Sequence, residues 1–446
     1  MVPERTKQPQ LTPGCTSRPE REWSGTTRPV ARTLHKNFDL ITEHTGMQTV
    51  ILAAGQGTRM RPLTERRAKP MLPVADRPLS AHTAKTAVDA GASRLIIVVG
   101  YESDAVCEFF GDEFAGVPVE YAEQTEQRGT ADAVRAAESH LDDGPFAVLN
   151  GDALYDEPSL TRLYEQAPAV GSYRVADPTQ YGVLYTAESD GDTRVTGVVE
   201  KPADPPSNRI NTGAYVFPAE AQAWLEVGES ERGELELTDV LERACEESTV
   251  AAVPFERWLD VGRPWELLEA NEWKVGELTR TLRGEVHEDA DIRGDVVVEA
   301  GATIDAGVVI EGPALVRRGA TVGPNAYIRG HTVVGNDAKV GHSVEVKNSV
   351  LMAGATVGHL SYVGDSVLGR DVNFGAGTTV ANLRHDDEAV KTLVKGELTS
   401  TGRRKFGVVC GDDAKTAIQT SLNAGVKLDC DATTTPGEVV LRDKSE

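Results

Sequence analysis

Two patterns of hydrophobic and polar residues divide the chain. Between residues 47 and 263, short apolar runs alternate with stretches of helical periodicity. This alternation predicts an α/β domain, a Rossmann-like parallel sheet with helices on both faces. The strands are expected at residues 50–52, 95–99, 117–121, 146–149 and 214–217. The helices are expected at residues 80–90, 130–140 and 234–244.

After Gly284 the apolar residues recur at every sixth position. The spacing holds ten times in succession from Ile292 to Val346, and it returns at 351–380 and at 410–434. Neither a helix of 3.6 residues per turn nor a strand of period two gives this spacing. A period of six is typical of a triangular coil whose marked side chains stack inside. We therefore predict a parallel β-helix of about eight coils, whose flat sides favour a homotrimer.

The same patterns set the predicted domain boundaries. Residues 47–263 form the α/β domain, 264–284 a linking amphipathic helix that extends to Arg283, and 285–440 the β-helix. Residues 1–46 hold five prolines, carry a net charge of +2 and lack periodicity, which predicts a disordered leader. Because Met47 opens a run typical of a buried strand, we expect it to be the true start.

Composition narrows the possible functions. The net charge is −23, and only 14 of the 46 basic residues are lysine. Such a surface repels phosphate backbones, which argues against a nucleic-acid partner, and suits a halophilic cytosol. The five cysteines lack zinc-ligand or disulfide spacing, and no apolar run approaches the ~20 residues of a membrane helix. We expect a soluble, cytoplasmic protein without a membrane partner.

A glycine-rich loop follows the first predicted strand, with the sequence LAAGQGTRMRPLT from Leu52. Gly55 and Gly57 permit a tight turn that presents N–H groups to an anion. Arg59 adds a planar cation, and Lys69, in the segment KPMLP, adds a second. The motifs GxxxxGK[ST] and GxGxxG are absent, which disfavours a Walker-type nucleotidase and a hydride-transfer enzyme. The loop predicts a phosphate site.

The segments LAAGQGTRMRPLT and KPMLPV resemble the signature of sugar-1-phosphate nucleotidylyltransferases, which join a nucleoside triphosphate to a sugar 1-phosphate and release pyrophosphate. The resemblance implies catalytic roles for Arg59 and Lys69 and Mg²⁺ ligation by Asp152 and Asp260. The nucleotide-binding residues that it implies are Leu52, Ala53, Gly55, Gly57, Thr58, Gln124, Gly129 and Thr130. The implied sugar-phosphate contacts are Gly182, Glu200, Lys201 and Asn211.

These residue types suit the chemistry. A sugar phosphate oxygen attacks the α-phosphorus in line, so catalysis consists mostly of positioning and charge neutralisation. Mg²⁺ prefers few carboxylates together with waters and phosphate oxygens. The attacking phosphate is already ionised and needs no general base. Uracil and thymine present the same edge to Gln124, so UTP and dTTP both remain open.

The β-helix region carries a second constellation around the segment GHLSYVGD at 358–365. With its flanking polar residues, it resembles the acetyltransferase half of the bifunctional N-acetylglucosamine-1-phosphate uridylyltransferase/glucosamine-1-phosphate N-acetyltransferase family, in its archaeal form. The resemblance covers nearly all of 47–440 and implies a left-handed β-helix with acetyl-CoA as co-substrate. It implies that His359 is the general base, oriented by Glu345. The implied contacts to the sugar phosphate are Arg329, Lys347, Tyr362, Asn373, Asn382 and Lys391.

The sequence departs from the bacterial pattern of this family. Leu383 stands where the bacterial enzymes have a tyrosine, Ile418 stands near an expected serine, and 383–406 form a charged insertion. The leading prediction is bifunctional synthesis of UDP-N-acetylglucosamine. One alternative is a monofunctional glucose-1-phosphate uridylyl- or thymidylyltransferase whose β-helix only oligomerises or regulates. A third is a non-enzymatic subunit that resembles translation exchange-factor subunits.

Triphosphate, sugar phosphate and coenzyme A are all anions. To bind them, so acidic a chain needs surface that is locally positive, the reverse of its overall charge. We expect this reversal at Arg59, Lys69, Lys201, Arg329, Lys347, Lys391 and 403–405.

Overall fold

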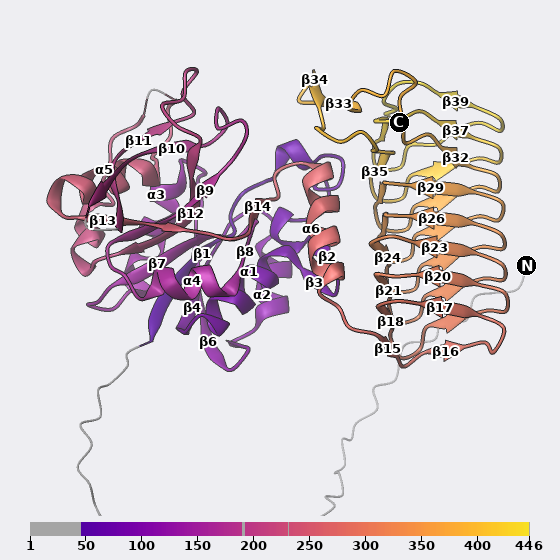
Figure 1. Ribbon diagram of the computed structural model, residues 1–446, viewed down its shortest axis with the longest axis horizontal. Helices are drawn as coiled ribbons and strands as arrows, with labels where there is room; N and C mark the ends of the chain where they lie inside the picture. The colour runs from indigo at the N-terminus through magenta and orange to yellow at the C-terminus, as the bar shows by residue number, and fades with distance from the viewer. Residues whose placement is uncertain (1–45, 190–191, 231, 446) are drawn as a thin grey trace, which may run out of the picture. The chain divides into compact units, whose positions relative to one another are not determined.

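The computed structural model describes residues 46–189, 192–230 and 232–445. The predicted disordered leader lies outside these residues except for Gly46, and the start at Met47 stays a prediction. Figure 1 shows an α/β region that ends with helix α6 and a tall stack of short strands from β15 to β39. In the part of the chain that the structure describes, no helix is long and apolar enough to cross a membrane.

A ten-stranded sheet forms the centre of the α/β domain, in the order β10-β11-β13-β9-β12-β7-β1-β4-β6-β5. The central strand β1 pairs in parallel with β4 and β7, whereas β12 runs antiparallel to β7 and β9. The strands are β1 Met47–Leu52, β4 Ala92–Val99, β5 Glu113–Phe114, β6 Val117–Glu123, β7 Phe146–Asn150, β9 Ala169–Arg174, β10 Gly182–Ser189, β11 Asp192–Glu200, β12 Arg209–Phe217 and β13 Val250–Pro254. All five predicted strands are present, and the one at 214–217 is antiparallel.

Helices cover both faces of this sheet because its strands are apolar on both sides. Val50 and Ile51 of β1 belong to two separate buried clusters, one on each face. Helices α1 (Leu79–Asp89), α2 (Ser103–Phe110) and α4 (Glu157–Tyr164) pack in the cluster of Ile51. Helices α3 (Thr130–Ala136) and α5 (Leu237–Glu247) pack in the cluster of Val50. The 3₁₀ turns are η1 Thr58–Met60, η2 Lys69–Met71, η3 Glu138–His140 and η4 Ala219–Trp224.

The linking helix is shorter than predicted. Helix α6 spans Pro264–Gly276, and β15 of the β-helix has already begun at Thr281, so the expected extension to Arg283 is wrong. The N–H of Leu278 bonds to the carbonyl of Val275 at 3.2 Å and closes the last turn. The backbone then enters the β-helix, where Thr281 pairs with Val297. A longer helix would use the backbone N–H and C=O groups of these residues, which are bonded instead to the neighbouring coil.

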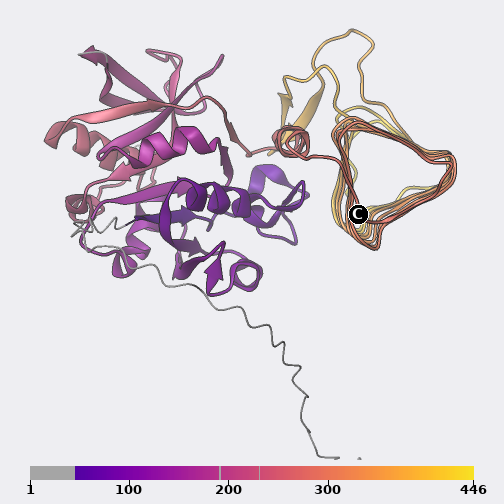
Figure 2. The same ribbon diagram turned by 60° about the horizontal axis from the view of Figure 1, so that its bottom comes forward.

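Three sheets form the sides of the β-helix, which is triangular in cross-section in Figure 2. The first sheet is β15 Thr281–Leu282, β18 Val296–Val298, β21 Ala314–Val316, β24 Thr332–Val334, β27 Val350–Leu351, β30 Val367–Leu368, β35 Val409–Cys410 and β38 Lys427–Leu428. The second is β16 Glu285–Val286, β19 Thr303–Ile304, β22 Thr321–Val322, β25 Lys339–Val340, β28 Thr356–Val357, β31 Asn373–Phe374 and β36 Lys415–Thr416. The third is β17 Asp291–Arg293, β20 Val309–Glu311, β23 Tyr327–Arg329, β26 Glu345–Lys347, β29 Tyr362–Gly364, β32 Thr379–Val380, β37 Ser421–Leu422 and β39 Val439–Val440. The predicted left-handed β-helix is confirmed.

The interior of the β-helix holds more than the residues that the six-residue period marks. Most of the marked side chains, such as Val346 and Val363, are buried in one continuous cluster, whereas Ile292 in the first coil and Thr434 in the last are partly exposed. Two residues before each marked position lies a second inward side chain, often alanine, as at Ala302 and Ala320. The sequence pattern gave no sign of this second column, since small residues carry little hydrophobic periodicity.

The predicted insertion leaves the coil after β32 and returns at β35. Its centre is a two-stranded hairpin, β33 (Lys391–Val394) and β34 (Glu397–Ser400). Arg403, at the end of the insertion, forms an ion pair with Glu272 of α6. This ion pair fixes the base of the hairpin while its tip stays exposed, as Leu398 shows with 65% exposure.

Candidate active sites

The glycine-rich loop begins at the carboxyl end of β1, where the parallel strands of the sheet open toward a crevice. Gly57 has a φ of +63°, and a Cβ there would lie 2.7 Å from Cβ of Lys69. Gly57 is therefore required by the fold. A Cβ on Gly55 would meet nothing within 4 Å, so the protein itself sets no limit on side-chain size at that position. A ligand that lies against the loop would explain this glycine.

The flanking residues of the loop are held by the sheet and the following turn. Ala53 is buried and donates its N–H to the carbonyl of Val98 at 2.8 Å, so that N–H is not available to a phosphate. Leu52 and Thr58 are half-buried. Thr58 opens the turn η1 that carries Arg59, and Arg59 lines a pocket that Asp152 and Asp260 also line.

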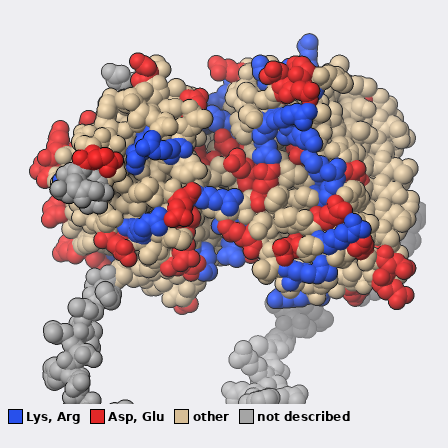
Figure 3. Space-filling view, viewed as in Figure 1, with Lys and Arg blue, Asp and Glu red and all other residues tan. Residues whose placement is uncertain are grey.

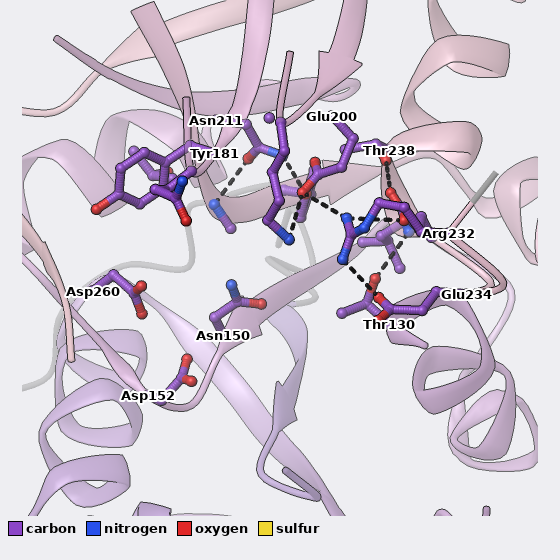
Figure 4. A pocket seen from close by; sticks show the side chains of 18 of the residues that line it. Thr130, Asn150, Asp152, Tyr181, Glu200, Asn211, Arg232, Glu234, Thr238 and Asp260 are labelled. Atoms are coloured by element: carbon purple, nitrogen blue, oxygen red, sulfur yellow. Dashed lines mark hydrogen bonds and ion pairs between the residues drawn. The ribbon is translucent and has the colours of Figure 1, made fainter. Parts of the chain in front are cut away.

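Asp152 and Asp260 come together through a short ribbon of two strands. Strand β14 (Trp258–Asp260) pairs antiparallel with β8 (Ala153–Tyr155), and the N–H of Val261 bonds to the carbonyl of Asp152 at 3.0 Å. Figure 4 shows the two carboxylates side by side at one end of the pocket. The ribbon thus joins two predicted site residues that are distant in sequence.

Opposite charges lie close together around these two carboxylates. Lys69 is only 7% exposed, and its ammonium bonds to Asp152. Burial alone would lower the pKa of Lys69, but the carboxylates of Asp152 and Asp260 outweigh it and raise that pKa. Loss of solvent and the charge of Asp152 raise the pKa of Asp260, against the opposing effect of Lys69. An additional cation would stabilise this pair of carboxylates.

The residues present fit a magnesium ion. Among the described residues, no group of three or more histidine, cysteine and acidic side chains could form a complete protein cage for a metal. Two carboxylates beside an open pocket are instead the ligand set that Mg²⁺ uses when substrate phosphates and waters supply the remaining oxygens. Asp152 and Asp260 provide that set.

The predicted sugar contacts line the other end of the same pocket. Glu200 pairs with Lys201 at 3.2 Å, and Lys201 has a φ of +44°, an unusual conformation for a residue with a side chain. The side-chain oxygen of Asn211 accepts the N–H of Gly213 at 2.8 Å. Gly182 and Lys201 line the same pocket, and Figure 4 shows Glu200 and Asn211 beside it.

Gln124 is buried and Gly129 is half-buried, and neither lines that pocket. The Gln124 amide group donates to the Gly129 carbonyl at 3.0 Å and to Asp132 at 3.1 Å. Only its carbonyl oxygen is left to accept, which suits the N3–H donor of a pyrimidine such as uracil or thymine. Gly129 has a φ of +133°, and a Cβ there would lie 2.2 Å from the carbonyl oxygen of Leu235. Thr130 lines the pocket and accepts the N–H of Leu237.

The sequence did not single out Arg232, which lines the pocket opposite the aspartates. Its guanidinium pairs with Glu200 at 3.3 Å, with Glu234 at 3.2 Å and with Glu236 at 3.1 Å. The available signal was an arginine followed closely by acidic residues in the segment RGELELTD. Trp258, also in the pocket, packs on Tyr181 with ring centroids 5.6 Å apart.

Four of the predicted acetyltransferase residues meet on the third sheet of the β-helix. Arg329 of β23 is paired in register with Lys347 of β26, and Tyr362 of β29 lies in the next coil. The amide of Asn382 donates to the hydroxyl of Tyr362 at 3.1 Å. Lys347 forms an ion pair with the buried Asp365 at 2.7 Å. These residues form one polar cluster on a coil that otherwise stacks apolar side chains.

His359 lies at the turn between the second and third sheets and is exposed. Glu345, which we expected to orient its ring, instead accepts the guanidinium of Arg329 at 2.9 and 2.7 Å. Asn373 is exposed on β31 of the second sheet. Among the described residues, no carboxylate is bonded to the ring of His359.

Lys391 lies apart from this cluster. It lines a second pocket between the hairpin and the last coils, together with Leu383, Leu393 and Leu398 and the cationic Arg384. Lys347 does not line that pocket. The pocket that holds Lys391 nevertheless adjoins the cluster, because its lining includes Ala381 and Leu383 on either side of Asn382.

The locally positive surface that we expected at the binding sites is only partly present. Lys69, Lys201, Arg329 and Lys347 each form an ion pair with a carboxylate. In Figure 3, Lys and Arg lie interspersed with Asp and Glu rather than in one broad basic patch. Of the residues at which we expected the reversal, Arg59, Lys391 and Lys405 form no ion pair with any described carboxylate, whereas Arg403 and Arg404 do. Acidic residues thus neutralise most of the expected cations locally.

Comparison with known proteins shows the family. The profile of the family described as nucleotidyl transferase matches residues 48–275, and that of the GMPPB C-terminal domain matches residues 310–429. The bifunctional protein GlmU of Methanocaldococcus jannaschii is 39% identical over 86% of this chain and 92% of its own length. A bifunctional sugar-1-phosphate nucleotidylyltransferase/acetyltransferase of Sulfurisphaera tokodaii is 36% identical over 89% of this chain and 98% of its own. The chain therefore belongs to the nucleotidyl transferase family, among the archaeal bifunctional sugar-1-phosphate nucleotidylyltransferase/acetyltransferases.

Membership of this family makes the chain a transferase and rules out the non-enzymatic subunit. A relative of different organisation, the UTP–glucose-1-phosphate uridylyltransferase AglF of Haloferax volcanii, is 36% identical. The match covers 52% of this chain and 99% of that protein. AglF thus corresponds in extent to only about half of this chain.

The two glycines of the loop give a sharp test of the nucleotide site. Gly55→Ala should leave the melting temperature unchanged, because its Cβ meets no protein atom, and should raise the KM for UTP at least about 10-fold by excluding a ligand from the loop. Gly57→Ala should lower the melting temperature, because its φ is +63° and its Cβ meets Lys69. Steady-state kinetics and thermal unfolding of both variants measure this. An unchanged KM in a well-folded Gly55→Ala variant would argue against nucleotide binding at the loop.

Proposed function

We propose that this protein makes UDP-N-acetylglucosamine in two steps at two sites. The β-helix transfers an acetyl group from acetyl-CoA to glucosamine 1-phosphate, and the α/β domain then joins the product to UTP and releases pyrophosphate. The observation that carries the proposal is that relatives with bifunctional names align along both domains, from the paired aspartates to the polar cluster on the third sheet. The residues of each site supply the chemistry that its step requires.

In the nucleotidyl step, an oxygen of the sugar phosphate forms a bond to the α-phosphorus of UTP as the bond to pyrophosphate breaks. Arg59 and Lys69 neutralise the charge that builds on the leaving group. Asp152 and Asp260 would hold Mg²⁺, which supplies further neutralisation when it is bound. The Gln124 carbonyl oxygen accepts the base N3–H. The carboxylate of Glu200 accepts hydrogen bonds from sugar hydroxyls, and the amide of Asn211 donates to one.

In the acetyl step, the amine nitrogen attacks the thioester carbonyl, so a C–N bond forms and the C–S bond breaks. His359 takes the proton from the amine and returns it to the departing thiolate. Arg329 and Lys347 bind the sugar phosphate, and Tyr362, Asn373 and Asn382 hold the sugar. The pocket beside the hairpin, with its leucines and with Lys391 and Arg384, combines the apolar and cationic surface that a coenzyme A molecule needs.

Several further properties belong to the same proposal. The enzyme is a cytoplasmic homotrimer that uses Mg²⁺, with the flat sides of its β-helices in contact. Its net charge of −23 favours activity at high salt, where self-repulsion is screened. Use of glucose 1-phosphate by the α/β domain alone is the second candidate, favoured by the match to AglF, but it leaves the polar cluster of the β-helix without a role.

The metal site predicts a selective loss of the nucleotidyl step. Asp152→Asn should reduce pyrophosphate release from UTP and N-acetylglucosamine 1-phosphate at least about 100-fold, because it removes one of two carboxylates for Mg²⁺. Acetyl transfer by the same variant should stay within about twofold of wild type, since the sites are separate. Asp143→Asn, at an exposed position, is the matched control and should behave as wild type. Equal activity of the two variants would refute the metal assignment.

The acetyltransferase site predicts the converse result, loss of acetyl transfer while nucleotidyl transfer is retained. His359→Ala should slow thiol release from acetyl-CoA and glucosamine 1-phosphate by about 100-fold or more, because no general base remains. Its pyrophosphate release from UTP should be unchanged. His342→Ala is the matched control, because His342 is also exposed and its carbonyl accepts the N–H of Leu360 in the next coil. Equal loss in both variants, or loss of both activities in the His359 variant, would contradict the two-site proposal.

A further inference from the structure

Asp365 is a buried acid at a corner of the β-helix. It follows directly after β29, is 2% exposed and has a φ of +52°. An aspartate tolerates this left-handed conformation better than most residues, but the conformation remains uncommon outside glycine. An ionised carboxylate at such a place requires both a cation and hydrogen-bond donors, since burying it alone is costly.

The surroundings of Asp365 supply these partners from three directions. Lys347 places its ammonium 3.0 and 2.7 Å from the two carboxylate oxygens. Asn348, at the same corner one coil earlier, donates its amide to one oxygen at 3.0 Å. Asn382, one coil later, donates to the other oxygen at 2.5 Å. Asp365 is thus enclosed between two asparagines, one from the preceding coil and one from the following coil, with the lysine bonded to both of its oxygens.

Two of these three partners are residues that we assign to the sugar phosphate. The remaining N–H of the Asn382 amide is used as well, since that group also donates to the hydroxyl of Tyr362 at 3.1 Å. Both donors of the amide are therefore fixed, and its carbonyl oxygen has no hydrogen-bond donor among the described residues. Because that oxygen cannot exchange places with the nitrogen without breaking both bonds, its direction is set by Asp365 and Tyr362.

We propose that Asp365 is the positioning residue of the acetyltransfer site. It does not contact the substrate, because it is buried, and it acts by fixing the Lys347 ammonium and the Asn382 amide in one arrangement before the sugar phosphate binds. The proposal rests on the proposed acetyltransferase function of the β-helix. Pre-set binding groups lower the cost of ordering the site, and a displacement of about 1 Å in such groups can cost up to about 100-fold in rate.

The test is a kinetic comparison of full-length variants. Asp365→Asn keeps the size of the side chain but places an amide among donors and removes the charge opposite Lys347. The KM for glucosamine 1-phosphate should rise about 10- to 100-fold, with a smaller change in kcat and no change in the KM for acetyl-CoA. Asp337→Asn is the matched control, because Asp337 has the same backbone conformation, with a φ of +57°, but is exposed. It should match wild type.

A double-mutant cycle separates positioning from a structural role. In a Lys347→Gln background, Asp365→Asn should add less than about threefold, because the residue through which it acts is already lost. Full additivity would overturn the proposal, as would an unchanged KM in a folded Asp365→Asn variant. If that variant fails to fold, Asn348→Ala removes a donor from the far side of Asp365, together with a bond to Glu272 of α6, and should raise the same KM about threefold or more. An unchanged KM there would equally overturn it.

These measurements distinguish failure of the positioning role of Asp365 from failure of the proposed acetyltransferase function. If the wild-type enzyme releases no thiol from acetyl-CoA and glucosamine 1-phosphate, the acetyltransferase assignment is wrong. If the wild type is active and the Asp365 and Asn348 variants match it, only the positioning role is wrong. Pyrophosphate release from UTP by each variant reports whether the rest of the chain is folded.

Discussion

Burial of apolar side chains on parallel strands is the interaction on which both sites depend. In the α/β domain it fixes β1 between β4 and β7, so that the glycine-rich loop leaves the sheet at its open edge. In the β-helix it fixes the register of successive coils, so that Arg329 and Lys347 lie side by side. Each site therefore inherits its geometry from a core that contains none of its reactive groups.

How far the sequence could predict this structure depended on how local the signal was. The six-residue period predicted the β-helix because every coil repeats it, and the loop around Gly55 and Gly57 predicted a phosphate site because its motif is contiguous. The end of helix α6 was misplaced because tertiary pairing with the first coil overrides helical periodicity at 277–283. Such competition between local and tertiary contacts is invisible in one sequence.

The partners of the site residues were less predictable than the residues themselves. Asp152 and Asp260 could be named, but the short ribbon that joins them could not, since β8 and β14 contain only three residues each. Glu345 was expected beside His359 but pairs instead with Arg329, which lies diagonally opposite it on the neighbouring strand β23. Asp365 carried no signal, since its role exists only after the coils have stacked.

Local neutralisation explains how an acidic protein can present cations to anionic substrates. Most of the cations at both sites are paired with a carboxylate, so that substrate phosphates must compete for them rather than meet a free positive field. Such pairing orders the side chains in advance. It also means that the two sites operate through specific contacts, which fits two independent reactions on one chain.

The most direct test of this account is pyrophosphate release by the wild-type enzyme from UTP and glucosamine 1-phosphate, measured with and without acetyl-CoA. The two-site account predicts that adding acetyl-CoA raises the rate and that UDP-N-acetylglucosamine is the product, with one thiol released for each pyrophosphate. Pyrophosphate release that is indifferent to acetyl-CoA, with no thiol formed, would contradict it.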